Sequence, residues 1–299
     1  MEPLNIGVLM ATNSKNSAYT NIERLEQAGL ERGYKIIRIC EPLLYFSYDG
    51  KNLKISHDGE PLFKLEVIIN RPNFICEPGL HAHTINLLKT LGVYILNGNH
   101  RAVSVAKNKL LQHHKFIEKN IPSPKWAMVN DPKIASIAAL NLGFPVIIKV
   151  AFGTHGIGTF FANSLETFMP LVDYLNVRDK NPIIIEEFIA EADKKDVRVY
   201  LIGGKIVAAM ERTSREHDIR SNAALGGNGG LVELTKEETE LAIKTAEAFE
   251  LDVIGIDILR SKRGPLVIEV NANPGFEVLE QVTGRDVAGA MIDEAIKHI

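Results

Sequence analysis

Residues 255–275 read GIDILRSKRGPLVIEVNANPG and decide the fold of the C-terminal part of the chain. Two apolar runs flank a short polar stretch that contains a glycine and a proline, which predicts two antiparallel strands and a tight connection. Asp257 lies on the first strand, and Glu269 and Asn271 lie on the second. Because side chains alternate along a strand, Glu269 and Asn271 share one face.

Both carboxylates lie inside apolar strands, where an unpaired charge is strongly destabilising. A divalent metal would neutralise them. Mg²⁺ prefers hard oxygen ligands, commonly one or two carboxylates completed by water and nucleotide phosphates, and an Asn amide oxygen is a suitable addition. The sequence therefore predicts a Mg²⁺ or Mn²⁺ site at Asp257, Glu269 and Asn271. The alternative, which stays open, is that Glu269 pairs with a buried Arg or Lys and Asp257 caps a strand end.

A shared metal requires Asp257 and Glu269 to lie on the same face of this hairpin. In an antiparallel pair, directly opposed residues share a face, and a one-residue slip reverses the relation. Opposing the two carboxylates pairs Arg260 with Leu266 and leaves residues 261–265 as the connection, in which Gly264 can take a positive φ. A four-residue connection would separate the carboxylates unless a bulge intervened. We predict an odd-length connection or a bulge.

A glycine-rich turn follows an apolar strand in KVAFGTHGIG, residues 149–158. Its glycines, Gly153, Gly156 and Gly158, let backbone N–H groups approach phosphates closely. The turn joins strand to strand, unlike the P-loop and the dinucleotide fingerprint, which both open a helix. This pattern favours a mobile hairpin lid over a triphosphate, with Lys149 as a point charge near the phosphates. A merely flexible turn is the alternative.

Two further clusters are consistent with nucleotide binding. The stretch Glu186, Glu187, Phe188 and Ile189 follows an apolar strand, where free backbone groups and an aromatic ring could hold an adenine. Arg212, Arg215 and Arg220 lie beside a glycine-rich loop and suit phosphates and developing oxyanions. A strand emerging into solvent and a solvated basic loop are the respective alternatives.

Composition excludes several classes of protein. The chain has 299 residues, 34 basic and 37 acidic side chains, and a formal charge of −3, so it has no general attraction for nucleic acid or anionic membranes. Two cysteines are too few for a disulfide framework or a thiolate metal site. The N-terminus lacks a signal-peptide pattern, and no apolar run approaches the roughly 20 residues that span a bilayer. We expect a cytoplasmic protein without nucleic acid or membrane partners.

Hydrophobic periodicity divides the chain into three α/β or α+β units, at residues 1–97, 98–187 and 188–299. The first is a small parallel domain with an inserted hairpin around Asp49 and Gly50, since Asp-Gly suits a tight turn. The second begins with one helix, HRAVSVAKNKLLQHHKFIEK, from about residue 99. The third contains a glycine-rich loop at 222–230 and a terminal helix after Gly284.

Taken together, these segments resemble the ATP-grasp superfamily, specifically its RimK-like ligases of the alpha-L-glutamate ligase type. The resemblance covers most of the chain and is strongest in GTHGIG (153–158), in DVRVYLIGGKIVAAMERTSREHDIRSN (196–222) and in GIDILRSKRGPLVIEVNANPGFEVLEQVTG (255–284). It implies an ATP-grasp fold, in which a parallel α/β domain precedes central and C-terminal α+β domains and ATP lies between the last two.

The resemblance also implies roles for individual residues. Lys109 and Lys149 would contact ATP, Glu187 and Phe188 would line the adenine pocket, and Asp196 would lie near the ribose. Arg220, Ser221 and Asn222 match a phosphate-binding motif, and Asp257, Glu269 and Asn271 match the metal ligands. One position departs from the family pattern: the chain reads RSNAALGGN, with Leu225 where RimK-type sequences usually have an Arg. This departure bears on the substrate more than on the reaction class.

The implied activity is ATP-dependent ligation of a carboxylate to an amine through an acyl phosphate, with Mg²⁺ as the metal. Glutamate or a related amino acid would be added to a peptide, protein terminus or carrier, and Arg212 and Arg220 would stabilise developing charge. Ligation on a small metabolite and a non-catalytic ATP-binding regulator are the alternatives. We expect a homo-oligomer, either a dimer or a tetramer.

Overall fold

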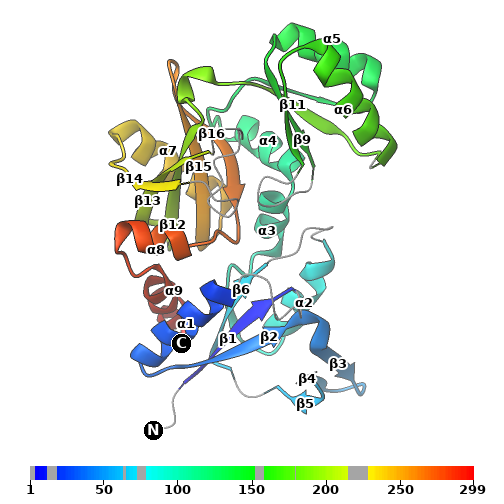
Figure 1. Cartoon of the computed structure of the whole chain (residues 1–299). Helices are drawn as coiled ribbons and strands as arrows, with labels where there is room; N and C mark the ends of the chain where they lie inside the picture. Colours follow the sequence, from blue (N-terminus) through cyan, green and yellow to red (C-terminus); the bar gives the residue numbers. More distant parts are fainter. Residues whose placement is uncertain are drawn as a thin grey trace.

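A computed structural model describes residues 4–11, 19–62, 65–72, 79–151, 158–178, 180–214 and 228–299. In this part of the chain, the strands form three larger sheets and one small three-stranded sheet. Figure 1 shows the N-terminal sheet at the bottom, with the two later sheets above it. This mixed architecture confirms the predicted combination of α/β and α+β units. No helix within these ranges is both long and apolar enough to cross a membrane.

The N-terminal sheet is parallel, with the strand order β2-β1-β6-β7. Its elements are β1 (Asn5–Met10), α1 (Tyr19–Glu31), β2 (Lys35–Cys40), β6 (Val67–Arg71), α2 (Gly79–Lys89) and β7 (Tyr94–Leu96). The apolar side chains of β1 and β6 are buried on both faces, as in other parallel sheets. All four strands end at one edge. Just beyond it, Asn97 Nδ2 donates to the carbonyls of Val253 and Ala272 at 2.7 and 3.1 Å, so this edge faces the C-terminal part.

The inserted hairpin is confirmed. After the short 3-10 turn η1 (Glu41–Leu43), the strands β3 (Leu44–Tyr48), β4 (Leu53–His57) and β5 (Glu60–Pro61) form a small antiparallel sheet. Asp49 Oδ1 accepts hydrogen bonds from the N–H groups of Lys51 and Asn52 at 3.0 and 2.9 Å, and Gly50 has a φ of +93°. The Asp side chain and the Gly backbone together make the turn.

The central sheet is antiparallel, in the order β10-β9-β11-β8. Its elements are β8 (Trp126–Val129), α5 (Pro132–Leu142), β9 (Val146–Val150), β10 (Thr159–Ala162), α6 (Leu165–Arg178) and β11 (Ile183–Glu187). Ile148, Ile183 and Ile185 pack in a core with residues of α5 and α6 on one face. Because side chains alternate, Lys149 and Glu186 project from the opposite face.

The third sheet is also antiparallel, in the order β14-β13-β12-β15-β16. Its strands are β12 (Lys195–Ile202), β13 (Lys205–Thr213), β14 (Asn228–Leu231), β15 (Val253–Ser261) and β16 (Gly264–Asn271), with η2 (Ala190–Ala192) before them. One face carries Val197, Ile256 and Val270, which share a core with α3 (His100–Lys107), α4 (Lys109–Glu118) and α7 (Lys236–Phe249). The other face turns toward the central and N-terminal sheets.

The single helix predicted from residue 99 is wrong, because α3 and α4 are separate helices. Asn108 between them has extended backbone angles, and its Oδ1 accepts from the N–H groups of Leu110 and Leu111 at 2.9 and 3.4 Å. Asn favours such a helix-capping position over a helix interior. The predicted 222–230 loop is also corrected at its end, where Asn228–Leu231 forms β14.

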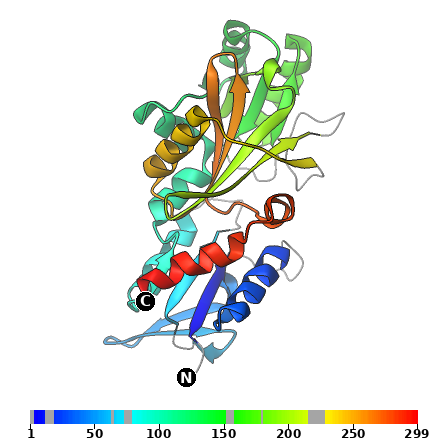
Figure 2. The same cartoon turned by 90° about the vertical axis from the view of Figure 1, so that its left-hand side faces the viewer.

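The chain ends with α8 (Glu277–Thr283), α9 (Val287–Ala295) and η4 (Ile296–His298), so the terminal helix expected after Gly284 is present. Figure 2 shows α9, in red, between the third sheet and α1, in blue. Tyr200 and Met210 of the third sheet, Val8 of β1 and Met291 of α9 belong to one buried apolar cluster. The first and third sheets therefore share a core. The predicted unit boundaries at 97 and 187 remain a proposal.

Candidate active site where the three sheets meet

Six polar residues on one face of the third sheet form what we call the polar row: Asp196, Arg198, Arg212, Asp257, Glu269 and Asn271. Strand register puts them together. Arg212 lies opposite Asp196, Arg198 lies opposite Asp257, and Asp257 lies opposite Glu269. Directly opposed residues and residues two apart on a strand share a face. The row therefore crosses β13, β12, β15 and β16.

Asp257 is buried and held by two arginines. Arg212 Nη2 lies 2.9 Å from Asp257 Oδ2, Arg198 Nη2 donates to the same oxygen at 2.8 Å, and Arg198 Nε also contacts the carboxylate. Arg212 in turn binds Asp196 through Nε and Nη2 at 2.6 and 2.9 Å. Burial alone would raise the pKa of Asp257, but the two guanidinium groups lower it to about 2. Asp257 is therefore a fixed anion at neutral pH.

The β15–β16 hairpin brings Asp257 and Glu269 to one face by means of a bulge. Ser261 pairs with Gly264 and Arg260 with Pro265, so the expected five-residue connection is wrong. The register shifts between Asp257 and Ile258, which confirms the bulge alternative. Gly264 takes a φ of +97°, which confirms the positive φ that its place in the predicted connection allowed.

Glu269 is held from the first turn of α4. Lys109 Nζ donates to Glu269 Oε1 at 2.7 Å, and the Lys109 N–H bonds to the carbonyl of Ala151 beyond β9 at 3.0 Å. Burial would raise the pKa of Glu269, but the Lys109 ammonium outweighs this effect and lowers it. Lys109 thus connects β16 to the start of the glycine-rich turn.

The central sheet contributes a buried cation and a buried carboxylate. Lys149 Nζ lies 2.8 Å from Glu186 Oε2, and His113 Nε2 lies 3.0 Å from Glu186 Oε1. Burial would raise the pKa of Glu186, but Lys149 and His113 lower it to about 2. Lys149 Nζ also lies 3.4 Å from the carbonyl oxygen of Ile268, at the bulge on β16. The central sheet therefore meets the third sheet at the polar row.

The polar row provides some, but not all, of the oxygen ligands that a hard divalent cation requires. The described residues contain no cluster of three or more His, Cys, Asp or Glu side chains that could hold a metal. The site would rest on two carboxylates and an amide, with water and phosphate oxygens completing the shell. Asn273 Oδ1 supports it, because this acceptor is buried without a hydrogen-bond partner, whereas the equally unpartnered Asn271 Nδ2 is a donor that suits a phosphate oxygen.

The alternative of simple ion pairing is also visible in the structure. Glu269 has its lysine partner, and Asp257 has its arginines, although Asp257 lies inside β15 and does not cap a strand end. A cation bound at Asp257 would have to replace at least one arginine contact. Ion pairing and metal binding are therefore two states that the same carboxylates could occupy.

Two of the backbone groups that were predicted to contact an adenine already have hydrogen-bond partners within the chain. The N–H of Glu187 donates to the carbonyl of Lys125 at 2.9 Å, and that of Phe188 donates to the carbonyl of Pro145 at 3.3 Å. The expectation of free backbone donors is therefore wrong for these two groups. The Phe188 ring contacts Phe161 edge-on at 5.2 Å between centroids. An adenine bound at this segment would therefore have to use groups other than these two N–H donors.

Several predicted residues lie outside the described ranges: Gly153, Gly156, Arg215, Arg220, Ser221, Asn222 and Leu225. Gly158 is described. It has a φ of +83°, and its carbonyl accepts from the Val150 N–H at 3.0 Å. Because β9 and β10 pair as antiparallel neighbours on either side of this turn, the prediction that it joins strand to strand is confirmed.

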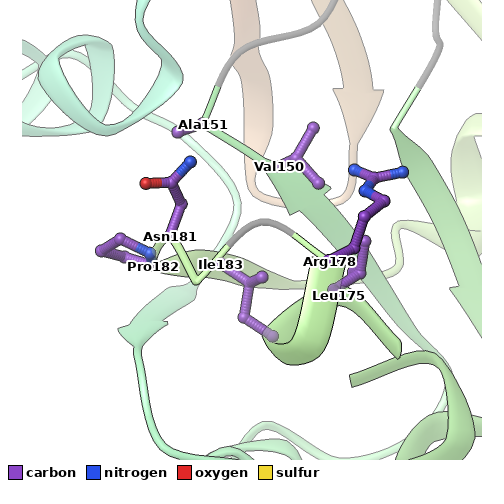
Figure 3. Close-up of a pocket in the computed structure, with 7 residues that line it drawn as sticks. All are labelled: Val150, Ala151, Leu175, Arg178, Asn181, Pro182 and Ile183. Carbon is purple, nitrogen blue, oxygen red and sulfur yellow. The ribbon is translucent and has the colours of Figure 1, made fainter. Parts of the chain in front are cut away.

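A cavity of about 190 Å³ lies at the end of α6 (Figure 3). Its lining includes Val150, Leu175, Arg178, Asn181 and Ile183. Val150 and Ile183 belong to the helix-covered face of the central sheet. The cavity is therefore on the opposite face from Lys149 and Glu186, and it is not part of the candidate site.

Sequence reasoning missed His113 and Arg198, and it placed Glu186 in an adenine-binding stretch without its cationic partner. His113 follows Lys109 by four residues, so helical periodicity puts the two on one face. Arg198 follows Asp196 by two residues on a strand, which also gives a shared face. Glu186 ends the buried part of β11, where a carboxylate inside an apolar run signals a cationic partner.

Comparison with known proteins adds independent findings. A family model described as the RimK-like ATP-grasp domain matches residues 106–295. The chain is 33% identical over 291 residues to a probable alpha-L-glutamate ligase of Marinomonas sp. (strain MWYL1), covering 97% of this chain and 94% of that protein. It is 34% identical over 286 residues to the ribosomal protein bS6–L-glutamate ligase of Shigella boydii serotype 4 (strain Sb227), covering 95% and 94%.

Solved structures agree on the fold. The ATP-grasp ligase PsnB complexed with a minimal precursor superimposes with a TM-score of 0.76 at 18% identity, covering all of both chains. A PsnB complex with a phosphomimetic precursor variant, Mg and ADP gives a TM-score of 0.70 at 16% identity and covers 98% of each chain. At these identities, the likeness concerns the fold alone.

Proposed function

Because this chain belongs to the RimK-like ATP-grasp ligases, enzymes that form carbon–nitrogen bonds, we propose that it adds glutamate or a related amino acid to a peptide, protein terminus or carrier. Two relatives that align along nearly the whole chain are named for glutamate ligation, and one of them for ribosomal protein bS6. The observation that carries the proposal is the meeting of Lys149 with the polar row, which gathers cations and carboxylates between two sheets.

The proposed reaction has two steps. An oxygen of a substrate carboxylate attacks the γ-phosphorus of ATP, and ADP leaves with the bridging oxygen, which gives an acyl phosphate. The amine of the amino acid then attacks the acyl carbon, phosphate leaves, and the amine loses a proton. No covalent bond to the protein is required, so the protein acts by positioning and by charge stabilisation.

The buried cations are placed for these steps. Lys149 and Lys109 come from different elements and both reach β16, at the Ile268 carbonyl and the Glu269 carboxylate, where they would balance phosphate charge. Arg212 binds both Asp196 and Asp257; its pair with Asp196 would keep the guanidinium in place to stabilise an oxyanion when a metal takes up Asp257. Arg220, Ser221 and Asn222 remain proposed phosphate contacts.

Asp257, Glu269 and Asn271 would hold Mg²⁺. When bound, the ion would neutralise charge on the phosphate oxygens during transfer. In the structure, each carboxylate is neutralised by a cation of the chain instead. This arrangement avoids unpaired buried charge when nucleotide is absent. Binding would therefore exchange ion pairs, and the carboxylates would stay charged throughout.

The test is incubation with ATP, Mg²⁺, a panel of amino acids and purified ribosomal protein bS6, reading ADP release and product mass together. The expected result is ADP release coupled to a mass gain of whole amino-acid residues on the acceptor. Nucleotide binding without turnover under every combination would favour the regulatory alternative. Turnover that requires a small metabolite as acceptor would move the enzyme to a different substrate class.

A further inference from the structure

Arg71 ends β6, at the edge of the N-terminal sheet that faces the third sheet. Its side chain comes from the same sheet edge that Asn97 joins to the third sheet. Only 5% of Arg71 is exposed. Its Nη2 donates to the carbonyl of Pro274 at 3.0 Å, and its guanidinium lies over the Phe276 ring, 5.4 Å from the centroid. The hydroxyl of Tyr200 also contacts it.

Arg71 differs from the other buried cations of this region in its partners. Lys109, Lys149, Arg198 and Arg212 each bind a carboxylate of the chain. Within the described ranges, Arg71 binds only neutral groups: a carbonyl, a phenol and an aromatic ring. A buried cation without a counter-ion is costly. Charge balance at this position therefore calls for an anion from outside the chain.

The position of Arg71 relative to the polar row follows from Pro274. A Cβ atom built on Gly255 would meet Pro274 Cβ at 2.6 Å and Arg198 Cδ at 3.4 Å. Pro274 therefore packs against the strand that carries Asp257, and its carbonyl holds Arg71 on the other side. An anion bound by Arg71 would lie beside the polar row. It would not itself be a ligand of the proposed metal.

Lys107 adds positive charge to the same region. Burial, together with the charges of Lys109 and Arg71, lowers the pKa of Lys107 to about 8, although the charge of Glu269 opposes this shift. The region between Arg71 and Lys109 is thus electropositive. An anion with one or two charges would relieve this repulsion, and this agrees with the geometric argument.

We propose that Arg71 binds a carboxylate of the amino acid that supplies the amine. This inference rests on the proposed ligase function. An amino-acid substrate must present its amine to the acyl phosphate while its own carboxylate is held and kept from phosphorylation. Arginine has five N–H donors in a planar fork that matches a carboxylate. One of these donors is used by Pro274, so the guanidinium is oriented before the substrate arrives.

The test compares Arg71→Met and Arg71→Lys with the wild type, using L-glutamate, L-isoglutamine and L-glutamine. The last two replace the α- and the side-chain carboxylate by a neutral amide. The expected result is a rise of about 10- to 100-fold in KM for L-glutamate in Arg71→Met, the scale of one lost charged hydrogen-bond set, with KM for ATP unchanged. Arg71→Lys should recover part of this loss.

The amide substrates distinguish carboxylate binding from a structural role. If Arg71 only stabilised the fold, its loss would not change the preference for L-glutamate over either amide. Wild type should favour L-glutamate over one of the two amides, and Arg71→Met should lose that preference. If the preference lost is that over L-isoglutamine, Arg71 binds the α-carboxylate; if it is that over L-glutamine, Arg71 binds the side-chain carboxylate. Arg38→Met is the matched control, because Arg38 lies on β2 of the same sheet, with β1 between it and β6, and pairs with Glu26 at 2.6 Å. It should behave as wild type.

Three results would overturn the inference: a parallel rise in KM for ATP, an unchanged preference for the acid over both amides, or a rise confined to KM of the acceptor. Thermal unfolding shows whether each variant is folded. Failure of the proposed function is distinguishable, since it would appear as no product with wild type. In that case, the affinity for L-glutamate is measured by calorimetric titration of each protein in the presence of an unreactive ATP analogue. Equal affinity of wild type and Arg71→Met for L-glutamate would refute the inference.

Discussion

At the scale of single residues, the site is built from buried charges that the chain neutralises internally. Asp257 lies between two arginines, Glu269 binds Lys109, and Glu186 binds Lys149. Removing one member of such a pair leaves the other uncompensated, which costs more than the pair contributes. Substitutions that keep the shape of a side chain are therefore the most informative tests.

Glu269→Gln keeps the shape and removes the charge. We expect a folded protein whose Mg²⁺-dependent ADP release falls on the order of 10²-fold or more, because an electrostatic contact to the transferring phosphate is lost. Glu211→Gln is the matched control: its side-chain exposure, 27%, is close to the 31% of Glu269, and it pairs with Lys195 at 3.1 Å on the same sheet. Turnover equal to wild type in Glu269→Gln, at any Mg²⁺ concentration, would refute the metal assignment.

Glu186 predicts a pH dependence of stability. Its pKa falls from 4.5 to about 2 in the fold, so its stabilising contribution is complete above about 4.5 and disappears as the pH falls through about 2. Between these values, Glu186→Gln should show a shallower loss of unfolding free energy than wild type, by up to about 1.4 kcal/mol per pH unit. Urea unfolding at several pH values measures both slopes, and identical slopes would contradict the prediction.

At the scale of elements, β16 is an edge strand whose outer backbone groups need partners. The Pro122 carbonyl accepts from the Val267 N–H at 2.8 Å, and Gln112 of α4 serves Val270. Its Oε1 accepts from the Val270 N–H at 2.8 Å, and its Nε2 donates to the carbonyls of Val270 and Ala106 at 3.0 and 2.7 Å. Val270 lies between Glu269 and Asn271, so this side chain fixes the backbone that presents two candidate ligands.

Gln112→Met should remove all three hydrogen bonds while keeping the apolar part of the side chain. Three buried groups left without partners cost at least about 1 kcal/mol each, so we expect the unfolding free energy to fall by about 3 kcal/mol or more. Mg²⁺-dependent turnover should fall as well, because β16 is no longer held. Chemical denaturation and ADP release measure the two effects. The exposed Gln27→Met, which loses one bond to Glu31, is the control.

A loss in Gln112→Met no larger than in the control would show that β16 is held without this side chain.

At the scale of the whole molecule, an ion-pair network joins the N-terminal sheet to the C-terminal helices. Arg24 of α1 binds Glu280 and Asp286 at 2.9 and 2.7 Å. Arg32, just after α1, binds Asp286 and Asp293 at 2.9 and 2.8 Å. These contacts lie where α1 and α9 run beside each other (Figure 2). The first and third sheets are thus joined by charges outside their shared apolar core.

The double substitution Arg24→Met and Arg32→Met should lower the unfolding free energy by only about 1 to 2 kcal/mol. Partly exposed pairs contribute about 0.2 to 1 kcal/mol each, and the apolar core remains. High salt should reduce the difference between variant and wild type, since it screens these charges. Unfolding at low and high ionic strength measures this. A difference that does not depend on salt would mean that packing of the arginine stems, and not charge, carries the effect.

The sequence by itself determined the features that depend on local pattern. Strand alternation indicated that Glu269 and Asn271 share a face, the Asp49 and Gly50 pair predicted the inserted hairpin, and the position of Gly158 before an apolar run predicted a strand-to-strand turn. The motifs from Lys149 onward were specific enough to indicate the ligase family. Each of these features depends on neighbours within a few residues, whose geometry is set by the backbone.

Only the tertiary structure decided which charges meet. Lys109 and Glu269 are 160 positions apart, and Arg71 and Pro274 are 203 apart, so no local pattern relates them. The break at Asn108 and the bulge after Asp257 were also decided there. Local sterics allow both the five-residue connection and the shorter connection with a bulge. The bulged register is selected because one face of β16 must be buried while the other presents Glu269. The sequence supplied the charged groups, whereas packing of the three sheets decided their partners.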